Sequence, residues 1–245
     1  MRETLKKLTE LKKAKHRILF GASALIVAIE ITLGTLLQVA SGDAVRYYSY
    51  AAVVLACLAA VMFAERSYSY LFVQLALVCT VGADYFLVFS AEQQQLPAMI
   101  FFSVTQLAYF ARIYSEEKPS ALRRWHVGVR IGACGAAVAA TFLVLGERAD
   151  AVAVVSMFYY ANLIMNIVFA FLQAKRNWFF IIGLILFLLC DTVIGVVSMA
   201  PYLTIAKDSL FYRMISPGFN LAWAFYIPSQ TLLVLSLFPK RVRTQ

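Results

Sequence analysis

Residues 177–199 read Asn-Trp-Phe-Phe-Ile-Ile-Gly-Leu-Ile-Leu-Phe-Leu-Leu-Cys-Asp-Thr-Val-Ile-Gly-Val-Val-Ser-Met, and Asp191 is the only charged residue among them. About 20 consecutive apolar residues are enough for a helix to cross the hydrocarbon core of a bilayer. The stretch therefore predicts a membrane-spanning helix that carries a carboxyl group at membrane depth. Such a group costs roughly 2.5–3.5 kcal/mol on insertion scales, so we expect it to be used.

Similar apolar runs occupy most of the remaining chain. The sequence is 62% hydrophobic and only 14% charged, whereas soluble domains average about 25% charged residues. We therefore predict an all-α fold, a polytopic transmembrane helix bundle with eight spans. These are residues 17–39, 46–64, 69–90, 95–114, 125–146, 150–172, 177–199 and 218–238. The domain organisation that follows is a basic N-terminal segment (1–16), one transmembrane domain (17–238) and a basic tail (239–245).

The distribution of lysine and arginine predicts the orientation. With the N-terminus in the cytoplasm, 18 of these residues fall on the cytoplasmic side and 4 on the other, a strong positive-inside bias. That count treats Arg112 and Arg130 as loop charges, and both histidines, His16 and His126, as lying at loop level. Both termini are then cytoplasmic, and the protein is a multi-pass protein of the cell membrane. The net charge of +9 is explained by this membrane topology, so no nucleic-acid partner is expected.

The four cysteines all fall in apolar runs, and we interpret them as reduced packing residues. No cysteine and histidine spacing is typical of a zinc site. The sequence therefore predicts no metal and no cofactor.

Counting residues into each span places several polar side chains at one depth. Asp84 lies about 15 residues and Asp191 about 14 residues from the inner surface, or roughly 20–23 Å at 1.5 Å per residue. Others reach a similar level from one side or the other: Glu30, Gln106, Asn162 and Gln230, with Asn166 and Tyr109 slightly deeper. The sequence thus predicts a polar layer near the middle of the membrane.

Each member of this layer also has a structural interpretation. A single glutamine or asparagine in a span often bonds a neighbouring helix, and Glu30 has the same alternative. The tyrosines in these spans are more often core or interface aromatics, and they are Tyr85, Tyr109, Tyr159, Tyr160 and Tyr226. For Asp84 and Asp191 a functional role is favoured.

Two carboxyl groups that face each other titrate as a pair, one protonated while the other is ionised. Such a pair supplies a general acid and a base in one site. This chemistry suits cleavage of an acid-labile bond, and it suits proton-coupled transport equally well. The residues alone leave both possibilities open.

Five segments in order carry a family resemblance. They are Leu-Ala-Leu-Val-Cys-Thr-Val-Gly-Ala-Asp (75–84), Phe-Phe-Ser-Val-Thr-Gln-Leu-Ala-Tyr-Phe-Ala-Arg-Ile (101–113), Phe-Tyr-Tyr-Ala-Asn-Leu-Ile-Met (158–165), Gly-Leu-Ile-Leu-Phe-Leu-Leu-Cys-Asp (183–191) and Phe-Tyr-Ile-Pro-Ser-Gln-Thr-Leu-Leu (225–233). Together they resemble the YhhN-type lysoplasmalogenases, eight-span membrane hydrolases. Three departures stand out: Ala83 intervenes between Gly82 and the first Asp, Gln106 stands where the family usually has a histidine, and Cys190 replaces a serine. The second span also lacks the opening Lys-Pro that is frequent in the family.

The resemblance implies hydrolysis of the vinyl-ether bond of lysoplasmalogens, with Asp84 and Asp191 as catalytic residues. The substrate would be a membrane lysophospholipid, and its expected contacts are Glu30, Gln106, Tyr109, Asn162, Gln230 and Tyr226. The alternative is a non-enzymatic transporter or lipid-binding membrane protein that uses the same polar layer.

Overall fold

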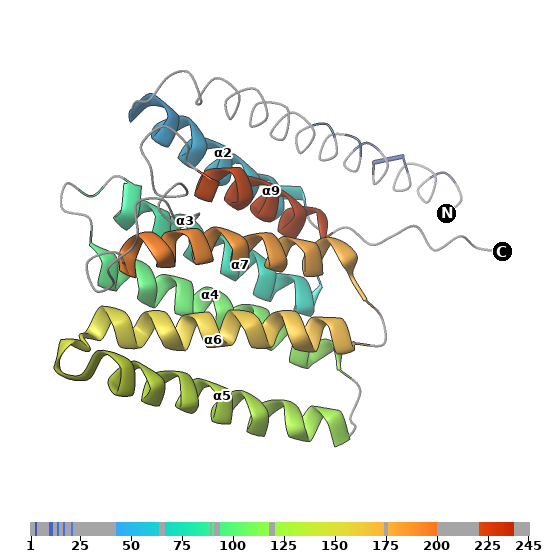
Figure 1. Ribbon diagram of the computed structural model, residues 1–245. Coiled ribbons are helices and arrows are strands. Elements are labelled where there is room, and N and C mark those ends of the chain that lie inside the picture. Colours follow the sequence, from blue (N-terminus) through green and yellow to red (C-terminus); the bar gives the residue numbers. More distant parts are fainter. Residues whose placement is uncertain are drawn as a thin grey trace.

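The computed structural model describes residues 43–63, 67–88, 90, 94–117, 121–173, 176–199 and 221–237, together with single positions at 3, 10, 11, 14, 17 and 21. Within these ranges the chain is all-α and contains no strand. The helices are α2 (Asp43–Phe63), α3 (Tyr68–Val88), α4 (Gln95–Glu116), α5 (Ala121–Leu145), α6 (Ala151–Leu172), α7 (Trp178–Met199) and α9 (Leu221–Leu235), with a 3-10 turn η1 at Gly146–Arg148 (Figure 1).

These helices match seven of the eight predicted spans to within a few residues. The largest difference at a helix start is at α5, which begins at Ala121 rather than at residue 125. Five of the described helices are long and apolar enough to cross a membrane, and α2 and α9 contain shorter apolar segments, Tyr50–Met62 and Ala222–Leu235. The first predicted span, 17–39, lies outside the continuously described ranges, so the total of eight and the orientation of the termini remain predictions.

Five helices form a ring. The principal contacts run from α3 to α4, from α4 to α6, from α6 to α7 and from α7 to α9, and α9 touches α3 to close the circuit. Helix α2 packs against both α3 and α9, and α5 lies outside the ring against α6 (Figure 1). The ring gives the bundle an interior that the inward faces of five helices share.

Small residues allow the ring helices to approach closely, as is usual between helices in membranes. At Gly183 of α7 an added Cβ would lie 3.0 Å from Cγ of Leu233 and 3.2 Å from the carbonyl oxygen of Ser229 on α9. The Ser229 hydroxyl donates to the Gly183 carbonyl over 2.8 Å. A Cβ added at Gly82 of α3 would likewise lie 3.1 Å from the ring of Phe101 on α4. These contacts fix the register of α7 against α9 and of α3 against α4.

Candidate active site

Asp84 points from α3 into the ring and is bound by a tyrosine of α9. Its side chain is only 3% exposed, and the Tyr226 hydroxyl donates to its Oδ2 over 2.7 Å. The tyrosine is held in turn by aromatic packing, with ring centroids 5.6 Å from Trp223 and 5.5 Å from Phe187. A buried polar group needs a hydrogen-bond partner, and Tyr226 provides one for this carboxyl.

Asp191 has the equivalent arrangement on the opposite pair of helices. It lies on α7, is half-buried, and accepts a hydrogen bond from the Tyr159 hydroxyl of α6. Each carboxyl group is therefore held by one phenol from a neighbouring helix.

The two pairs belong to one site. Phe187, one turn before Asp191, lies between the tyrosines, with its ring centroid 5.5 Å from Tyr226 and 6.5 Å from Tyr159. Phe102 of α4 closes this aromatic layer, 5.9 Å from Phe187 and 5.7 Å from Tyr159. Asp84 and Asp191 are close enough for their charges to interact. The carboxyl groups predicted from depth thus point inward, toward a shared interior, and not into lipid.

Three of the predicted polar residues form a second network beside this site. Arg130 of α5 donates to Oδ1 of Asn162 over 2.8 Å and to Oδ1 of Asn166 over 2.8 Å. Asn166 then donates from Nδ2 to the side-chain oxygen of Gln106 over 3.0 Å. The second amide, Asn162, donates to the Phe158 carbonyl and to Sγ of Cys134. The depth argument places these residues together, but it does not predict the arginine that joins the two asparagines.

Arg130 and His126 correct the topology argument. The sequence predicts both at loop level, yet Arg130 is 5% exposed and the His126 side chain is completely buried. The His126 ring stacks on Phe169, with centroids 3.5 Å apart. Helix α5 starts earlier than predicted, so that both side chains lie within the helix and point toward α4 and α6.

The histidine connects the arginine to a carboxylate. Nδ1 of His126 lies 3.0 Å from Glu117, and Nε2 lies 3.3 Å from an Arg130 amino group. Because arginine can only donate, Nε2 is the acceptor and Nδ1 carries the proton that is donated to Glu117. A charge at Arg130 is thus balanced by Glu117 through a neutral imidazole.

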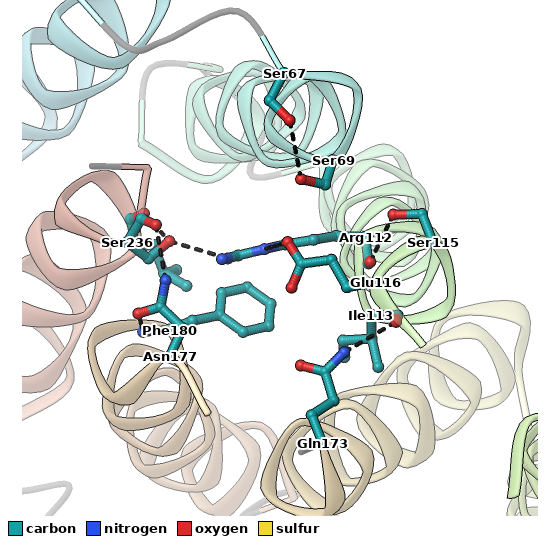
Figure 2. Close-up of polar contacts among 11 residues, drawn as sticks. Ser67, Ser69, Arg112, Ile113, Ser115, Glu116, Gln173, Asn177, Phe180 and Ser236 are labelled. Carbon is teal, nitrogen blue, oxygen red and sulfur yellow. Dashed lines mark hydrogen bonds and ion pairs between the residues drawn. The ribbon is translucent and has the colours of Figure 1, made fainter. Parts of the chain in front are cut away.

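Arg112 is a second buried arginine that the topology argument assigns to a loop. It is 2% exposed and lies near the end of α4, where Figure 2 shows it reaching across the ring seen nearly end-on. Its NH1 group donates to the Ser236 hydroxyl over 3.0 Å, its Nε lies 3.6 Å from Glu116, and its guanidinium carbon lies 3.9 Å from the centroid of Phe180. These contacts close one end of the ring interior.

Gln230 and Tyr109 are buried between the Asp pair and the end of the ring that Arg112 closes. Neither the amide atoms of Gln230 nor the hydroxyl of Tyr109 have a hydrogen-bond partner within the described part of the chain. The Tyr109 ring packs edge-on against Phe180, 5.5 Å away. Glu30 lies outside the described residues, as does the loop 200–217.

The comparison with protein families identifies the kind of bundle. A model of the YhhN family matches residues 45–237, most of the chain. The chain belongs to the YhhN family. No curated protein and no solved structure matches it.

The YhhN match spans every helix of the ring, so both aspartates and their tyrosine partners lie within it.

All four cysteines are buried and unpaired, in line with the packing role expected for them. In the ranges that the structure describes, no three His, Cys, Asp or Glu side chains are grouped so as to hold a metal ion.

Sequence reasoning misses several polar residues in and around the site. It groups Tyr159 with ordinary core aromatics, and it assigns Arg112, His126 and Arg130 to loops. One signal is present for Arg130: four further residues, 121–124, precede the predicted start of its span without a proline or glycine. Extending the helix backward over them places Arg130 nine residues, or roughly 13 Å, inside it.

Proposed function

We propose that this YhhN-family protein hydrolyses the vinyl-ether bond of lysoplasmalogens by general acid–base catalysis with Asp84 and Asp191. One observation carries the proposal: two carboxyl groups share the interior of the ring, each held by a tyrosine hydroxyl. A single proton shared by such a pair leaves one group as an acid and the other as a base.

The chemistry matches a two-carboxyl site. The protonated carboxyl delivers its proton to the outer carbon of the C=C–O group, which leaves an oxocarbenium ion stabilised by the ionised carboxyl. A water molecule adds its oxygen to the cationic carbon and loses a proton to a carboxylate. The hemiacetal then collapses: its hydroxyl proton is removed, the C–O bond to glycerol breaks, and the departing oxygen takes a proton. The products are a fatty aldehyde and a glycerophospho-alcohol, with one water consumed and no oxidant or reductant required.

The tyrosines have positioning roles in this mechanism. Each binds the Oδ2 atom of its carboxyl, so we assign proton exchange with the substrate to the Oδ1 atoms. Phe102 and Phe187 provide an apolar layer next to the carboxyl groups, suited to an alkenyl chain. Gln106, Tyr109 and Gln230 remain candidates for contact with the substrate, whereas the amide of Asn162 is already bonded to Arg130, Cys134 and Phe158.

The test is aldehyde release from lysoplasmalogen by the purified protein. We expect Asp84→Asn and Asp191→Asn each to abolish release. Asp150→Asn is a matched control, because Asp150 is exposed and caps α6 by accepting from the Ala153 amide over 2.8 Å. It should keep full activity.

A lysophospholipid with a saturated ether supplies the substrate control. It has no double bond to protonate, and we expect no product from it. Full activity in either buried-Asp variant contradicts the mechanism. Substrate uptake into proteoliposomes without aldehyde release would instead support the transporter interpretation.

A further inference from the structure

The interior of the ring is organised in levels along its axis. On one side lie Phe102 of α4 and Tyr226 of α9, both in contact with Phe187. Ten residues further along the chain lie Arg112 of α4 and Ser236, directly after the end of α9, which bond each other. At 1.5 Å per residue both helices advance about 15 Å between these levels, so α4 and α9 run in step from the Asp pair to the closed end.

Gln106 and Gln230 occupy the same intermediate level. Gln106 follows Phe102 by four residues, and Gln230 follows Tyr226 by four residues. Each glutamine therefore lies about 6 Å beyond the aromatic layer. Both side chains are completely buried.

The hydroxyl of Tyr109 belongs to this intermediate region as well. It is close enough to interact electrostatically with the Tyr159 hydroxyl on the side of Asp191 and with the Arg112 guanidinium on the other. Side chains on a helix lean toward its N-terminus, which for Tyr109 is the direction of Gln106.

The orientation of the Gln106 amide is fixed by its neighbours. Arg130 can only donate, so it fixes Oδ1 of Asn166 as its acceptor and directs Nδ2 of Asn166 to the oxygen of Gln106. The nitrogen of Gln106 then remains as a buried donor, and it has no partner in the described part of the protein.

Four polar atoms at this level thus lack a partner among the described residues: Nε2 of Gln106, Nε2 and Oε1 of Gln230, and the hydroxyl of Tyr109. An unmatched buried polar group costs about 1–3 kcal/mol. A buried water molecule typically makes two to four hydrogen bonds to such groups.

We propose that Gln106, Gln230 and Tyr109 bind ordered water inside the ring, one helical turn from the Asp pair. Water accepts hydrogen bonds from the two amide nitrogens and donates one to Oε1 of Gln230. With the Tyr109 hydroxyl it can either donate or accept. The ligand is neutral, because no charged side chain among the described residues bonds these four atoms: Arg112 is bound by Ser236 and Glu116, and Arg130 by Asn162 and Asn166.

The water site depends only on burial and hydrogen bonding. Its use rests on the proposed function: it would hold the molecule that adds to the oxocarbenium carbon. Arg130 acts as a positioning residue here, since it determines through Asn166 which atom of Gln106 faces the water.

The test is X-ray hydroxyl-radical footprinting of the resting protein in detergent without substrate, which oxidises side chains beside bound water. We expect oxidation of Tyr109 even though it is fully buried, and the exposed Tyr68 is the positive control for labelling. Oxidation of Tyr109 should fall to background in the Gln106→Leu/Gln230→Leu variant, which removes both amides without adding a sulfur that reacts with the radicals. It should be unchanged in Gln74→Leu, whose amide bonds the Ala60 carbonyl elsewhere.

Two results would overturn the proposal. One is absence of Tyr109 oxidation in the wild-type protein while Tyr68 is labelled. The other is equal oxidation of Tyr109 in the wild-type protein and the double variant. If the double variant elutes as an aggregate, Gln230→Leu alone gives the same comparison. None of these outcomes depends on turnover, so the water site and the proposed hydrolysis fail independently.

Discussion

Tyr226→Phe tests whether the tyrosines hold the carboxyl groups for catalysis. The substitution removes one hydroxyl, which donates to Oδ2 of Asp84 over 2.7 Å. The ring itself remains, so the packing against Phe187 and Trp223 at 5.5 and 5.6 Å is kept. The variant therefore isolates a single hydrogen bond.

The expected magnitude follows from the charge on the acceptor. A hydrogen bond to an ionised group contributes about 1.5–3 kcal/mol, and each 1.36 kcal/mol of transition-state stabilisation is tenfold in rate. If the bond to Asp84 is fully expressed in the transition state, kcat falls about 10- to 100-fold. KM should change little, because the hydroxyl contacts the carboxyl of the protein.

The assay is initial-rate aldehyde release over a range of lysoplasmalogen concentrations. Tyr160→Phe is the matched control: its hydroxyl bonds Oγ1 of Thr192 over 2.8 Å and neither carboxyl group, so kcat should match the wild type. An unchanged kcat in Tyr226→Phe, or an equal loss in Tyr160→Phe, would refute the reasoning.

Two further predictions concern stability, measured as unfolding in detergent. Arg130→Met should destabilise the protein by about 3–5 kcal/mol, because it leaves the side chains of two asparagines and a histidine without their shared donor; the exposed Arg124→Met is the control, and equal stability of the two would contradict the network. Gly183→Ala should cost about 1–3 kcal/mol, because its Cβ would meet α9 at 3.0 Å. Gly132→Ala has open space around it and should be neutral or stabilising by up to about 1 kcal/mol, and a loss there as large as at Gly183 would show that packing against α9 does not decide the effect.

The positions of the helices could be predicted because span length is set by the thickness of the bilayer. The depth of Asp84 and Asp191 followed directly, since each residue advances a helix by a fixed distance. Their partners could not be predicted in this way. Tyr226 is 142 residues from Asp84, and Tyr159 is 32 residues from Asp191, so both pairs depend on how the helices are arranged around the ring.

The buried arginines were assigned to loops for a different reason. Counting lysine and arginine assigns every basic residue near a span end to the adjacent loop. Arg112 lies near the end of α4 and Arg130 lies nine residues into α5, and both are bonded within the bundle. The positive-inside rule describes how lysine and arginine are distributed on average between the two sides of a membrane protein. The position of one arginine depends on whether buried acceptors surround it.

Gln106 connects the Arg130 network to the proposed water site. The chemistry of its amide restricts what can pass from one to the other. A glutamine donates and accepts hydrogen bonds but takes up no proton. Its oxygen is bonded to Asn166 and, through that residue, to the Arg130 network, while its nitrogen faces the level below the Asp pair. Hydrogen-bond orientation is therefore transmitted from the arginine to the ring interior, but no proton is. Among Gln106, Asp84 and Asp191, the proton transfers of the proposed hydrolysis therefore fall to the two carboxyl groups.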